Sequence, residues 1–306
     1  MDYIDVTILG DSNPVPQPPR FIRRIGDGVP EIVDRLAKRR RAGETPVGLS
    51  TGIQTLDDST DGLEPGDFYL MGSTFPRDLT GLSLQIAIHV ASNPKHSAAI
   101  LSYHHSESQL VSRIVCNKED LDEVMLFDSK VSQTREWEKY LRGFDHLMAL
   151  PLYIAAPFQK PFNELYGNCL QLRDTIPNLA LIVIDDLQGS IQQGTQDFDG
   201  AEISQQLKEI AVETQTCVMA TTQLPHYVSQ RRYARPVLRD FHHEGRLDYY
   251  ADVVGGLCRD SCHQSLEGDG VFNLVELILL KNTKGSTDTI RLIRERFSER
   301  FTDGVS

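Results

Sequence analysis

The chain lacks the features that would place it in a membrane or outside a cell. No apolar run approaches the ~18 residues needed to span a bilayer, and Met1–Gly10 carries no signal-peptide pattern. The cysteines are odd in number and scattered, at positions 116, 169, 217, 258 and 262, which argues against a disulfide framework. We therefore expect a cytoplasmic protein with reduced thiols and no membrane partner.

A complete set of metal ligands is also missing. Cys258, Cys262 and His263 lie close together in the sequence, but no second pair of ligands completes a tetrahedral zinc site. We expect buried or surface thiols here and no metal.

Basic residues are scarce as well. The chain has 31 Lys and Arg against 43 Asp and Glu, a net charge of −12, which opposes wholesale binding to a phosphate backbone. The arginines nevertheless gather in two segments, 20–41 and 230–246. The second segment supplies the candidate DNA contacts, which are Arg231, Arg232, Arg235, Arg239 and Arg246. For either segment, a solvated or subunit-contacting surface is the favoured interpretation over DNA contact. Aromatic platforms for single strands are sparse near the second segment, at Tyr227 and Tyr233.

What the chain does contain is a regular alternation of apolar strands and helical stretches. The expected strands are Phe68–Met71, Ala98–Tyr103, Leu181–Ile184, Cys217–Thr221, Val253–Leu257 and Phe272–Leu280. The expected helices are Leu82–Ser92, Ser108–Cys116, Arg135–Met148, Phe162–Thr175 and Ile203–Thr214. This order predicts an α/β fold with a largely parallel sheet and helices on both faces, with any ligand at the carboxyl ends of the strands.

The segment Gly66–Ala91 has the strand, loop and helix of a nucleotide phosphate site. A working loop reads G-x-x-x-x-G-K-[ST], in which glycines admit the phosphates to backbone N–H groups and the lysine reaches the β- and γ-phosphates. The window Ser73–Thr80 keeps the final threonine, but Asp78 replaces the second glycine and Leu79 replaces the lysine. A like charge about 4 Å from a phosphate costs roughly 4 kcal/mol at an effective dielectric of 20, close to a thousandfold in affinity. We expect no cofactor, and neither ATP nor Mg²⁺ to bind in the conventional way.

Seven segments between Val29 and Phe301 follow one another in a family-specific order. They are VGLSTGIQTLDDSTDGLEPGDFYLMG at 47–72, Leu150–Ile154, Leu181–Gln188, Ala220–Gln223, Arg235–Asp240, Asp248–Val254 and Leu277–Gly285. Single elements such as T-G-x-x-x-L-D occur in other RecA-like proteins, but the ordered set resembles the C-terminal RecA-like motor domain of DnaB-type replicative helicases. This resemblance implies a RecA-like P-loop NTPase fold.

The resemblance assigns family roles to single residues, and several of these residues have altered chemistry. Thr80 matches the Mg²⁺-coordinating threonine, Asp185 the Walker B aspartate and Gln223 the polar sensor. His104 stands at the catalytic glutamate, and the K-x-R finger motif has become Lys281-Asn282-Thr283, without its arginine. Arginine fingers contribute roughly 10³–10⁵ in rate where they have been measured. We interpret eight residues as remnants of a nucleotide site and none of them as catalytic. They are Ser73, Asp78, Leu79, Thr80, His104, Asp185, Gln223 and Lys281.

The predicted organisation has three parts. Residues 1–28 form an extension with a short strand at Tyr3–Leu9 and a proline-rich linker, residues 29–45 a linker helix, and residues 46–306 the RecA-like domain. Pro30 suits the first helical position, and Ile32, Val33 and Leu36 share one face of the helix. That helix packs either on its own core or, as the resemblance implies, on an adjacent subunit. Gly189–Gly200, rich in Gln and Gly, is expected to be a mobile loop.

These observations lead to a pseudoenzyme hypothesis. The chain would be a catalytically inactive DnaB-like helicase homologue, kept as a structural, DNA-associated or regulatory subunit of a replication-type complex. Its partners would be further copies of itself, a helicase or another DNA-handling protein, and weakly bound single-stranded DNA. The alternative is a divergent ATP-dependent helicase, in which Arg77 replaces the lysine, His104 the glutamate, and Lys284 or Arg291 the finger. Binding of an unrelated small molecule is a third interpretation.

Overall fold

The computed structural model describes residues 25–43, 46–126, 136–155, 164–192, 199–242, 245–259, 274–295 and 298–304. The chain divides into two compact units, residues 1–43 and 44–306. In the first unit, α1 (Ile25–Ala42) exposes the apolar side chains of Ile25, Val29, Ile32, Val33 and Leu36 and ends in three arginines. Among the described residues, no helix is long and apolar enough to cross a membrane.

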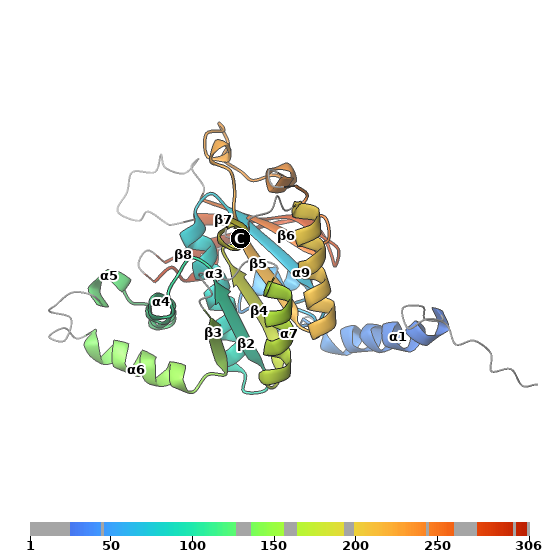
Figure 1. Cartoon of the computed structure of the whole chain (residues 1–306), viewed down its shortest axis with the longest axis horizontal. Coiled ribbons are helices and arrows are strands. Elements are labelled where there is room, and N and C mark those ends of the chain that lie inside the picture. The colour runs from blue at the N-terminus through green and yellow to red at the C-terminus, as the bar shows by residue number, and fades with distance from the viewer. Residues whose placement is uncertain are drawn as a thin grey trace, which may run out of the picture. The chain divides into compact units, whose positions relative to one another are not determined.

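A single mixed sheet forms the centre of the second unit (Figure 1). Its described strands are β1 (Phe68–Ser73), β2 (Ser97–Ser102), β3 (Leu152–Ala155), β4 (Leu179–Asp185), β5 (Cys217–Gln223), β6 (Val253–Arg259), β7 (Leu274–Asn282), β8 (Thr289–Arg294) and β9 (Phe301–Asp303). They lie in the order β3-β2-β4-β5-β1-β6-β7-β8-β9. Neighbouring strands are parallel throughout the part β3-β2-β4-β5-β1-β6, and β7, β8 and β9 extend the sheet with antiparallel pairing. The predicted α/β class and largely parallel sheet are confirmed.

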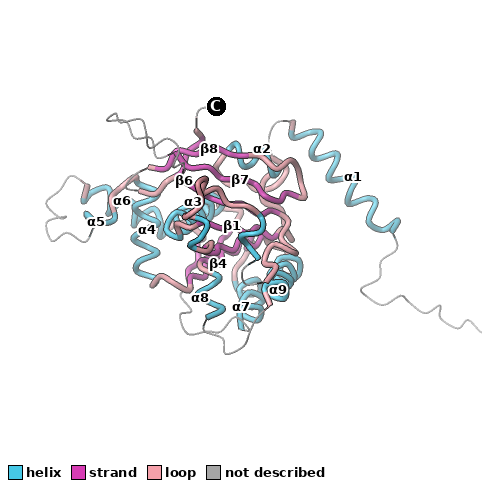
Figure 2. Tube along the Cα trace, turned by 90° about the horizontal axis from the view of Figure 1, so that it is seen from above, coloured by secondary structure: helices cyan, strands magenta, loops and turns pink. Residues whose placement is uncertain are grey.

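Helices cover both faces of the sheet (Figure 2). The described helices of the second unit are α2 (Gln54–Thr60), α3 (Pro76–Ser92), α4 (Glu107–Glu119), α5 (Glu123–Leu126), α6 (Trp137–Met148), α7 (Leu165–Thr175), α8 (Leu187–Gln192) and α9 (Gly200–Thr214). Alternate residues of one strand face opposite ways. Tyr69 and Met71 of β1 therefore pack in the cluster containing α3, whereas Phe68 and Leu70 pack in the cluster containing α7 and α9.

Some predicted boundaries are wrong. The helix expected from Leu82 begins at Pro76, because proline fits the first helical position and Leu79 already packs in the core. Pro30 does not start its helix but lies inside α1. The loop expected over Gly189–Gly200 is helical at its start, because α8 extends to Gln192, and α9 begins at Gly200. The predicted strand Tyr3–Leu9 and the proline-rich linker lie outside the described residues.

Candidate functional site

The carboxyl ends of β2, β4 and β5 meet the first turn of α3 around a cavity of about 320 Å³. Five of the predicted remnants line it, which are Leu79, Thr80, His104, Asp185 and Gln223. Arg77, His105, Arg113, Glu123 and Asp186 also contribute to the wall. This is the edge of a parallel sheet where ligands bind in open α/β folds, and the volume is at the lower limit for a small-molecule pocket.

The connection between β1 and α3 is very short. β1 ends at Ser73 and α3 begins at Pro76, so only Thr74 and Phe75 lie between them. The backbone N–H of Asp78 donates to the carbonyl of Phe75 at 3.0 Å. A phosphate-binding loop instead directs successive N–H groups into a concave nest around the anion. Here the same stretch of sequence is wound into the first turn of a helix.

Asp78 is a buried anion with two arginine partners. Its side chain is 1% exposed, and Nε and Nη2 of Arg259 donate to the two carboxylate oxygens at 2.8 and 2.9 Å. Nε of Arg294 lies 2.8 Å from Oδ1 of Asp78 in an ion pair. Hydrogen bonding to Asp78 raises the pKa of Arg259. The expectation that Asp78 would direct an uncompensated charge at a phosphate is therefore wrong, because arginines from β6 and β8 neutralise that charge.

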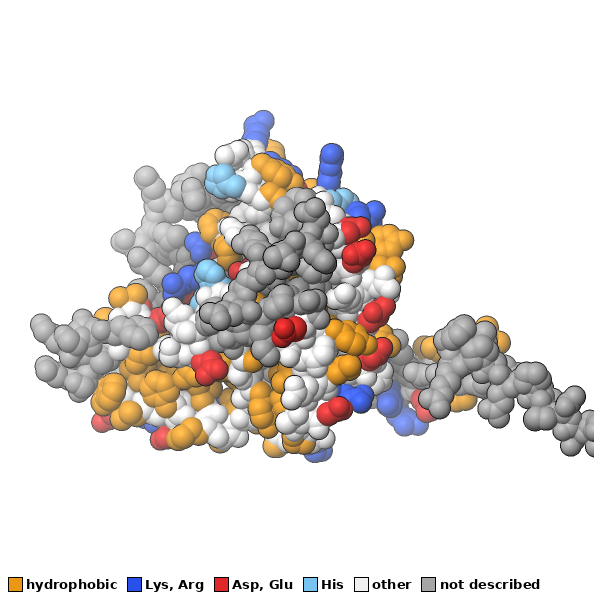
Figure 3. Space-filling model, in the orientation of Figure 1, with side chains coloured by type: hydrophobic (Ala, Val, Ile, Leu, Met, Phe, Trp, Pro, Cys, Tyr) orange, Lys and Arg blue, Asp and Glu red, His pale blue; other side chains and the backbone are white. Residues whose placement is uncertain are grey.

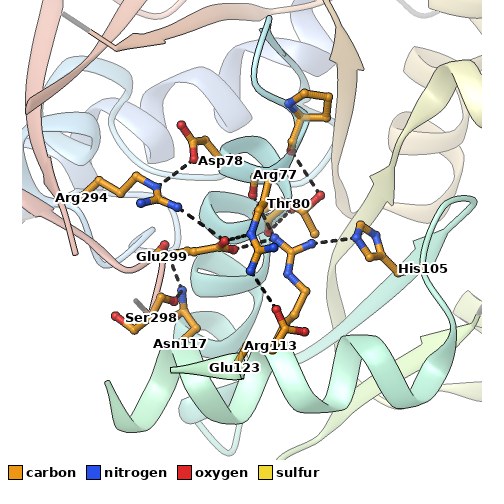
Figure 4. Close-up of polar contacts among 12 residues, drawn as sticks. Arg77, Asp78, Thr80, His105, Arg113, Asn117, Glu123, Arg294, Ser298 and Glu299 are labelled. Carbon is orange, nitrogen blue, oxygen red and sulfur yellow. Dashed lines mark hydrogen bonds and ion pairs between the residues drawn. The ribbon is translucent and has the colours of Figure 1, made fainter. Parts of the chain in front are cut away.

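A second carboxylate, Glu299, lies beside the same helix (Figure 4). Nε of Arg77 donates to Oε1 of Glu299, Nη2 of Arg113 donates to Oε2 at 2.7 Å, and Nη2 of Arg294 lies 3.4 Å from Oε1. Nη2 of Arg77 also donates to Glu123 at 2.8 Å. Burial, the largest single effect, lowers the pKa of Arg77, but the hydrogen bonds and charges of Glu299 and Glu123 together outweigh it, so the pKa is raised overall. The arginine considered as a substitute for the lysine is thus held by two carboxylates.

Asp185 retains its expected place at the end of β4. It accepts hydrogen bonds from Thr80 Oγ1 and Ser102 Oγ, both at 2.8 Å, and its Oδ2 lies 3.3 Å from Nδ1 of His105. Burial raises the pKa of the Asp185 carboxyl, but the hydrogen bonds from His105, Ser102 and Thr80 outweigh this and lower it overall. The contact between Thr80 and Asp185 keeps together the residues that the resemblance matches to the Mg²⁺-coordinating threonine and the Walker B aspartate.

The two histidines after β2 have different roles. The side chain of His104, the residue at the glutamate position, is 69% exposed, and its Nδ1 lies 3.8 Å from Asp186. His105 is the residue beside Asp185, and its Nε2 lies 2.8 Å from Nη1 of Arg113. Since arginine can only donate, Nε2 of His105 accepts and Nδ1 carries the hydrogen that faces Asp185.

The other predicted site residues divide into near and distant ones. Leu79 is 2% exposed and belongs to the core between α3 and the sheet. Ser73 Oγ accepts the N–H of Phe75 at 3.0 Å, and Gln223 is exposed at the end of β5. Lys281 does not line the cavity: its Nζ donates to the carbonyls of Asp248 and Tyr249 at 3.0 and 2.9 Å. Burial lowers the pKa of Lys281.

The candidate replacements for the finger are also distant from the cavity. Lys284 has a side chain 6% exposed, and its Nζ donates to Asp67 and to the carbonyl of Gly62, both at 2.7 Å. Arg291 is exposed on β8 and lines a different cavity, beside α2. Within one chain, neither Lys284 nor Arg291 reaches the cavity wall.

Most of the candidate DNA-binding arginines are paired. Nη1 of Arg231 donates at 2.8 Å to Asp240, which is fully buried, and Nη2 donates to the other oxygen of the same carboxylate. Arg235 lies 3.1 Å from Glu276, and Arg246 lies 3.3 Å from Asp248. Arg232 and Arg239 are exposed, with Arg232 over the ring of Tyr233 at 5.5 Å. Basic side chains project at the top of the face in Figure 3.

Sequence reasoning missed the residues that give this site its character. Five residues were not placed there from the sequence, which are His105, Arg113, Arg259, Arg294 and Glu299. An aspartate at the glycine position, Asp78, was nevertheless a signal that a cation would lie beside it. Among the described cysteines, Cys116, Cys169, Cys217 and Cys258 are buried and reduced. No group of three metal-ligating side chains occurs in the described part of the chain, and Cys262 and His263 lie outside it.

Comparisons with known proteins agree in pointing to one family. A model of the DnaB-like helicase C-terminal domain matches residues 48–303. The replicative DNA helicase DnaB of Geobacillus stearothermophilus is 29% identical over 257 residues, which are 82% of this chain and 55% of that protein. The replicative DNA helicase DnaC of Bacillus subtilis is 28% identical over 286 residues, 92% of this chain and 62% of that protein. The chain thus spans little more than half the length of these relatives.

Solved structures show the same fold. A structure described as an ATPase domain superimposes with a TM-score of 0.81 at 21% identity, covering 92% of this chain and 100% of that one. A DnaB-like replicative helicase, described together with its interactions with primase, has a TM-score of 0.80 at 21% identity and covers 93% of this chain and 68% of that one. The RecA-like fold expected from the sequence is confirmed.

Proposed function

Since the chain belongs to the DnaB-like helicase C-terminal domain family, we propose that it is a catalytically inactive member that serves a replication-type complex as a structural, DNA-associated or regulatory subunit. The observation that carries this proposal is the state of the first turn of α3. Where a phosphate-binding loop would surround the anion, the chain has a helix whose Asp78 is neutralised by Arg259 and Arg294. The protein supplies its own anion near the positive end of this helix.

Entry of a nucleotide would carry a large cost. The phosphates would have to unwind the first turn of α3 and separate Asp78 from its arginines. Breaking a buried ion pair costs about 3–5 kcal/mol, whereas a micromolar ligand gains about 8 kcal/mol in total. The remaining 3–5 kcal/mol corresponds to a dissociation constant on the order of a millimolar. Leu79, which stands at the lysine position, carries no charge that could offset this cost, and it is packed in the core.

One observation favours the alternative of a divergent ATPase. Thr80 and Asp185 remain 2.8 Å apart beside an open cavity, as groups that share a cation would. In the same cavity, however, Arg77 is held by Glu299 and Glu123, and His104 is exposed to solvent. Neither proposed substitute is directed at the Thr80–Asp185 pair, so we favour the inactive reading.

A titration with ATP and Mg²⁺ separates the two readings. We expect no binding tighter than about a millimolar and no hydrolysis above background. Turnover that Asp185→Ala abolishes would refute the proposal. Restoring the loop with Asp78→Gly and Leu79→Lys should not produce hydrolysis, because His104 and Thr283 still occupy the glutamate and arginine positions. Rapid turnover in that double variant would show that the missing groups lie elsewhere.

For partners, we propose further copies of this chain or a helicase, with weak contact to single-stranded DNA. Exposed apolar side chains support an assembly role, on α1 and around α5 and α6, where Val124, Leu141 and Met148 are 75%, 45% and 79% exposed. Figure 3 shows apolar side chains gathered at lower left, over α6. The DNA contact rests on Arg232 and Arg239, because Arg231, Arg235 and Arg246 have carboxylate partners.

A further inference from the structure

Residues 298–303 form a strap that lies along α3 and α4. The side-chain amide of Gln85 bonds the backbone of Phe301 in both directions, each at 2.7 Å. Nδ2 of Asn117 donates to the carbonyls of Ser298 and Glu299 at 3.3 and 3.2 Å. A Cβ on Gly81 of α3 would lie 3.0 Å from the carbonyl of Glu299, so the approach is close. Side chains of two helices therefore fix the backbone of the strap at Glu299.

The backbone of Glu299 is held in an uncommon conformation. Its φ is +57°, in the left-handed region that non-glycine residues rarely occupy and that persists where surrounding contacts over-determine it. The result is that its side chain, 8% exposed, points into the space between α3 and α4. The strained backbone of Glu299 costs free energy, and contacts of its carboxylate with neighbouring side chains offset this cost.

These neighbouring side chains are an arginine cradle formed by Arg77, Arg113 and Arg294 (Figure 4). Three guanidinium groups face one carboxylate. Arg77 is shared with Glu123 and Arg294 with Asp78, whereas Glu299 is the carboxylate bound by Arg113. The side chains of Arg113 and Arg294 are 5% and 10% exposed, so their charges are poorly screened by water.

The cradle and the adjoining strap have more donors than Glu299 can satisfy. Nε of Arg113 and Oγ of Ser298 are buried and have no hydrogen-bond partner among the residues that the structure describes. Leaving such groups unpaired costs free energy. A planar carboxylate offers two oxygens, whereas a tetrahedral oxyanion offers four and suits clustered arginines.

We propose that the arginine cradle is a binding site for a tetrahedral oxyanion of the phosphate class, and that the 298–303 strap closes it by inserting the Glu299 carboxylate. The strap is a built-in occupant, and the site accepts an external anion when Glu299 is withdrawn or neutralised. This inference rests on the proposed function in one respect: a protein that bound nucleotide in the conventional way would not keep its own carboxylates at this end of α3.

Neutralising the occupant tests the proposal. In Glu299→Gln, the cradle loses the carboxylate that its three arginines share, while the side chain keeps its shape and Arg77 and Arg294 keep their second carboxylates. Inorganic phosphate should then raise the melting temperature of the full-length variant by about 2–5 °C at saturation, relative to sodium chloride of equal ionic strength. Wild-type protein, with the cradle filled, should show no such phosphate-specific rise. Glu138→Gln, which removes an exposed carboxylate on α6, is the matched control and should behave as wild type.

A second substitution identifies the site. Adding Arg113→Gln to Glu299→Gln should abolish the phosphate-specific rise. Equal rises in all variants, or no rise in Glu299→Gln, would overturn the proposal. If Glu299→Gln does not fold in chloride, its refolding yield in phosphate becomes the readout, and recovery in phosphate supports the site whereas no recovery overturns it. ATP hydrolysis by the wild type would refute the proposed function but would leave these phosphate measurements to decide the cradle separately.

Discussion

Replacing Asp78 with asparagine should destabilise the protein, although it removes a charge that opposes phosphate binding. Asparagine keeps the shape but leaves two arginines without their anion. Removing one partner of a buried pair costs about 3–5 kcal/mol. The cost in this variant is smaller, because the Arg259 side chain is 46% exposed and can be hydrated by water, and because Arg294 keeps its ion pair with Glu299 at 3.4 Å. We therefore expect a loss of about 2–3 kcal/mol in the free energy of unfolding.

Urea unfolding followed by circular dichroism measures this loss as a lower midpoint with an unchanged m-value. The melting temperature should fall by about 4–10 °C for a domain of this general size. Asp58→Asn is the matched control, because Asp58 is exposed on α2 and accepts a bond from Gln54. A loss below about 0.5 kcal/mol, the range of ordinary surface substitutions, would show that Asp78 is not a structural anion.

Three further predictions concern assembly, DNA and pH. Deleting residues 1–41, which removes the exposed apolar face of α1, should lower the mass of the oligomer in light scattering without unfolding the core; an unchanged mass would exclude α1 from assembly. Substituting both Arg232 and Arg239 by alanine should weaken binding of single-stranded DNA in a fluorescence anisotropy titration at low salt. The slope of log affinity against log salt concentration should fall by about 0.7 per lost phosphate contact. Arg231→Ala should mainly reduce stability, and unchanged affinity in the double variant would refute DNA contact. The pKa of Asp185 is lowered in the folded state, so the stabilisation by its carboxylate is present above the unfolded pKa of about 3.9 and is lost as pH falls through the folded pKa. The difference in unfolding free energy between wild type and Asp185→Asn should therefore be constant above about pH 5 and shrink in acid. A constant difference down to about pH 3 would contradict this.

The fold was largely readable from the sequence because its central strands are buried on both faces. Val183 and Met219, in β4 and β5, stand in short continuous apolar runs, which is the pattern of parallel strands covered by helices. The strands that were missed are short or peripheral. β3 has four residues at one edge of the sheet, β9 has three at the other, and β8 alternates exposed and buried side chains. Their pairing depends on neighbours that no local pattern specifies.

The site was only partly readable, because its charge pairs join distant parts of the chain. The sequence shows Asp78 and Leu79 at the glycine and lysine positions of the motif. However, Arg259 lies 181 residues from Asp78, and Glu299 lies 186 residues from Arg113. Motif alignment also selected His104, whereas the turn after β2 places His105 against Asp185. A sequence shows which residues depart from a motif, but the residues that pair with them are set by tertiary packing.

The cap of α2 has a consequence for the order in which this protein is made. Ile53 precedes the helix and has no side-chain acceptor, so the first turn is capped by the Asp303 carboxylate, which accepts the N–H groups of Gln54 and Thr55 at 3.0 and 3.1 Å. The partners are 249 and 248 residues apart. At about 5–20 residues per second of synthesis, Asp303 follows Gln54 by roughly 10–50 seconds. α2 is without its cap during that time, in which the other described strands are translated, so capping of α2 waits for β9, the last described strand to be made.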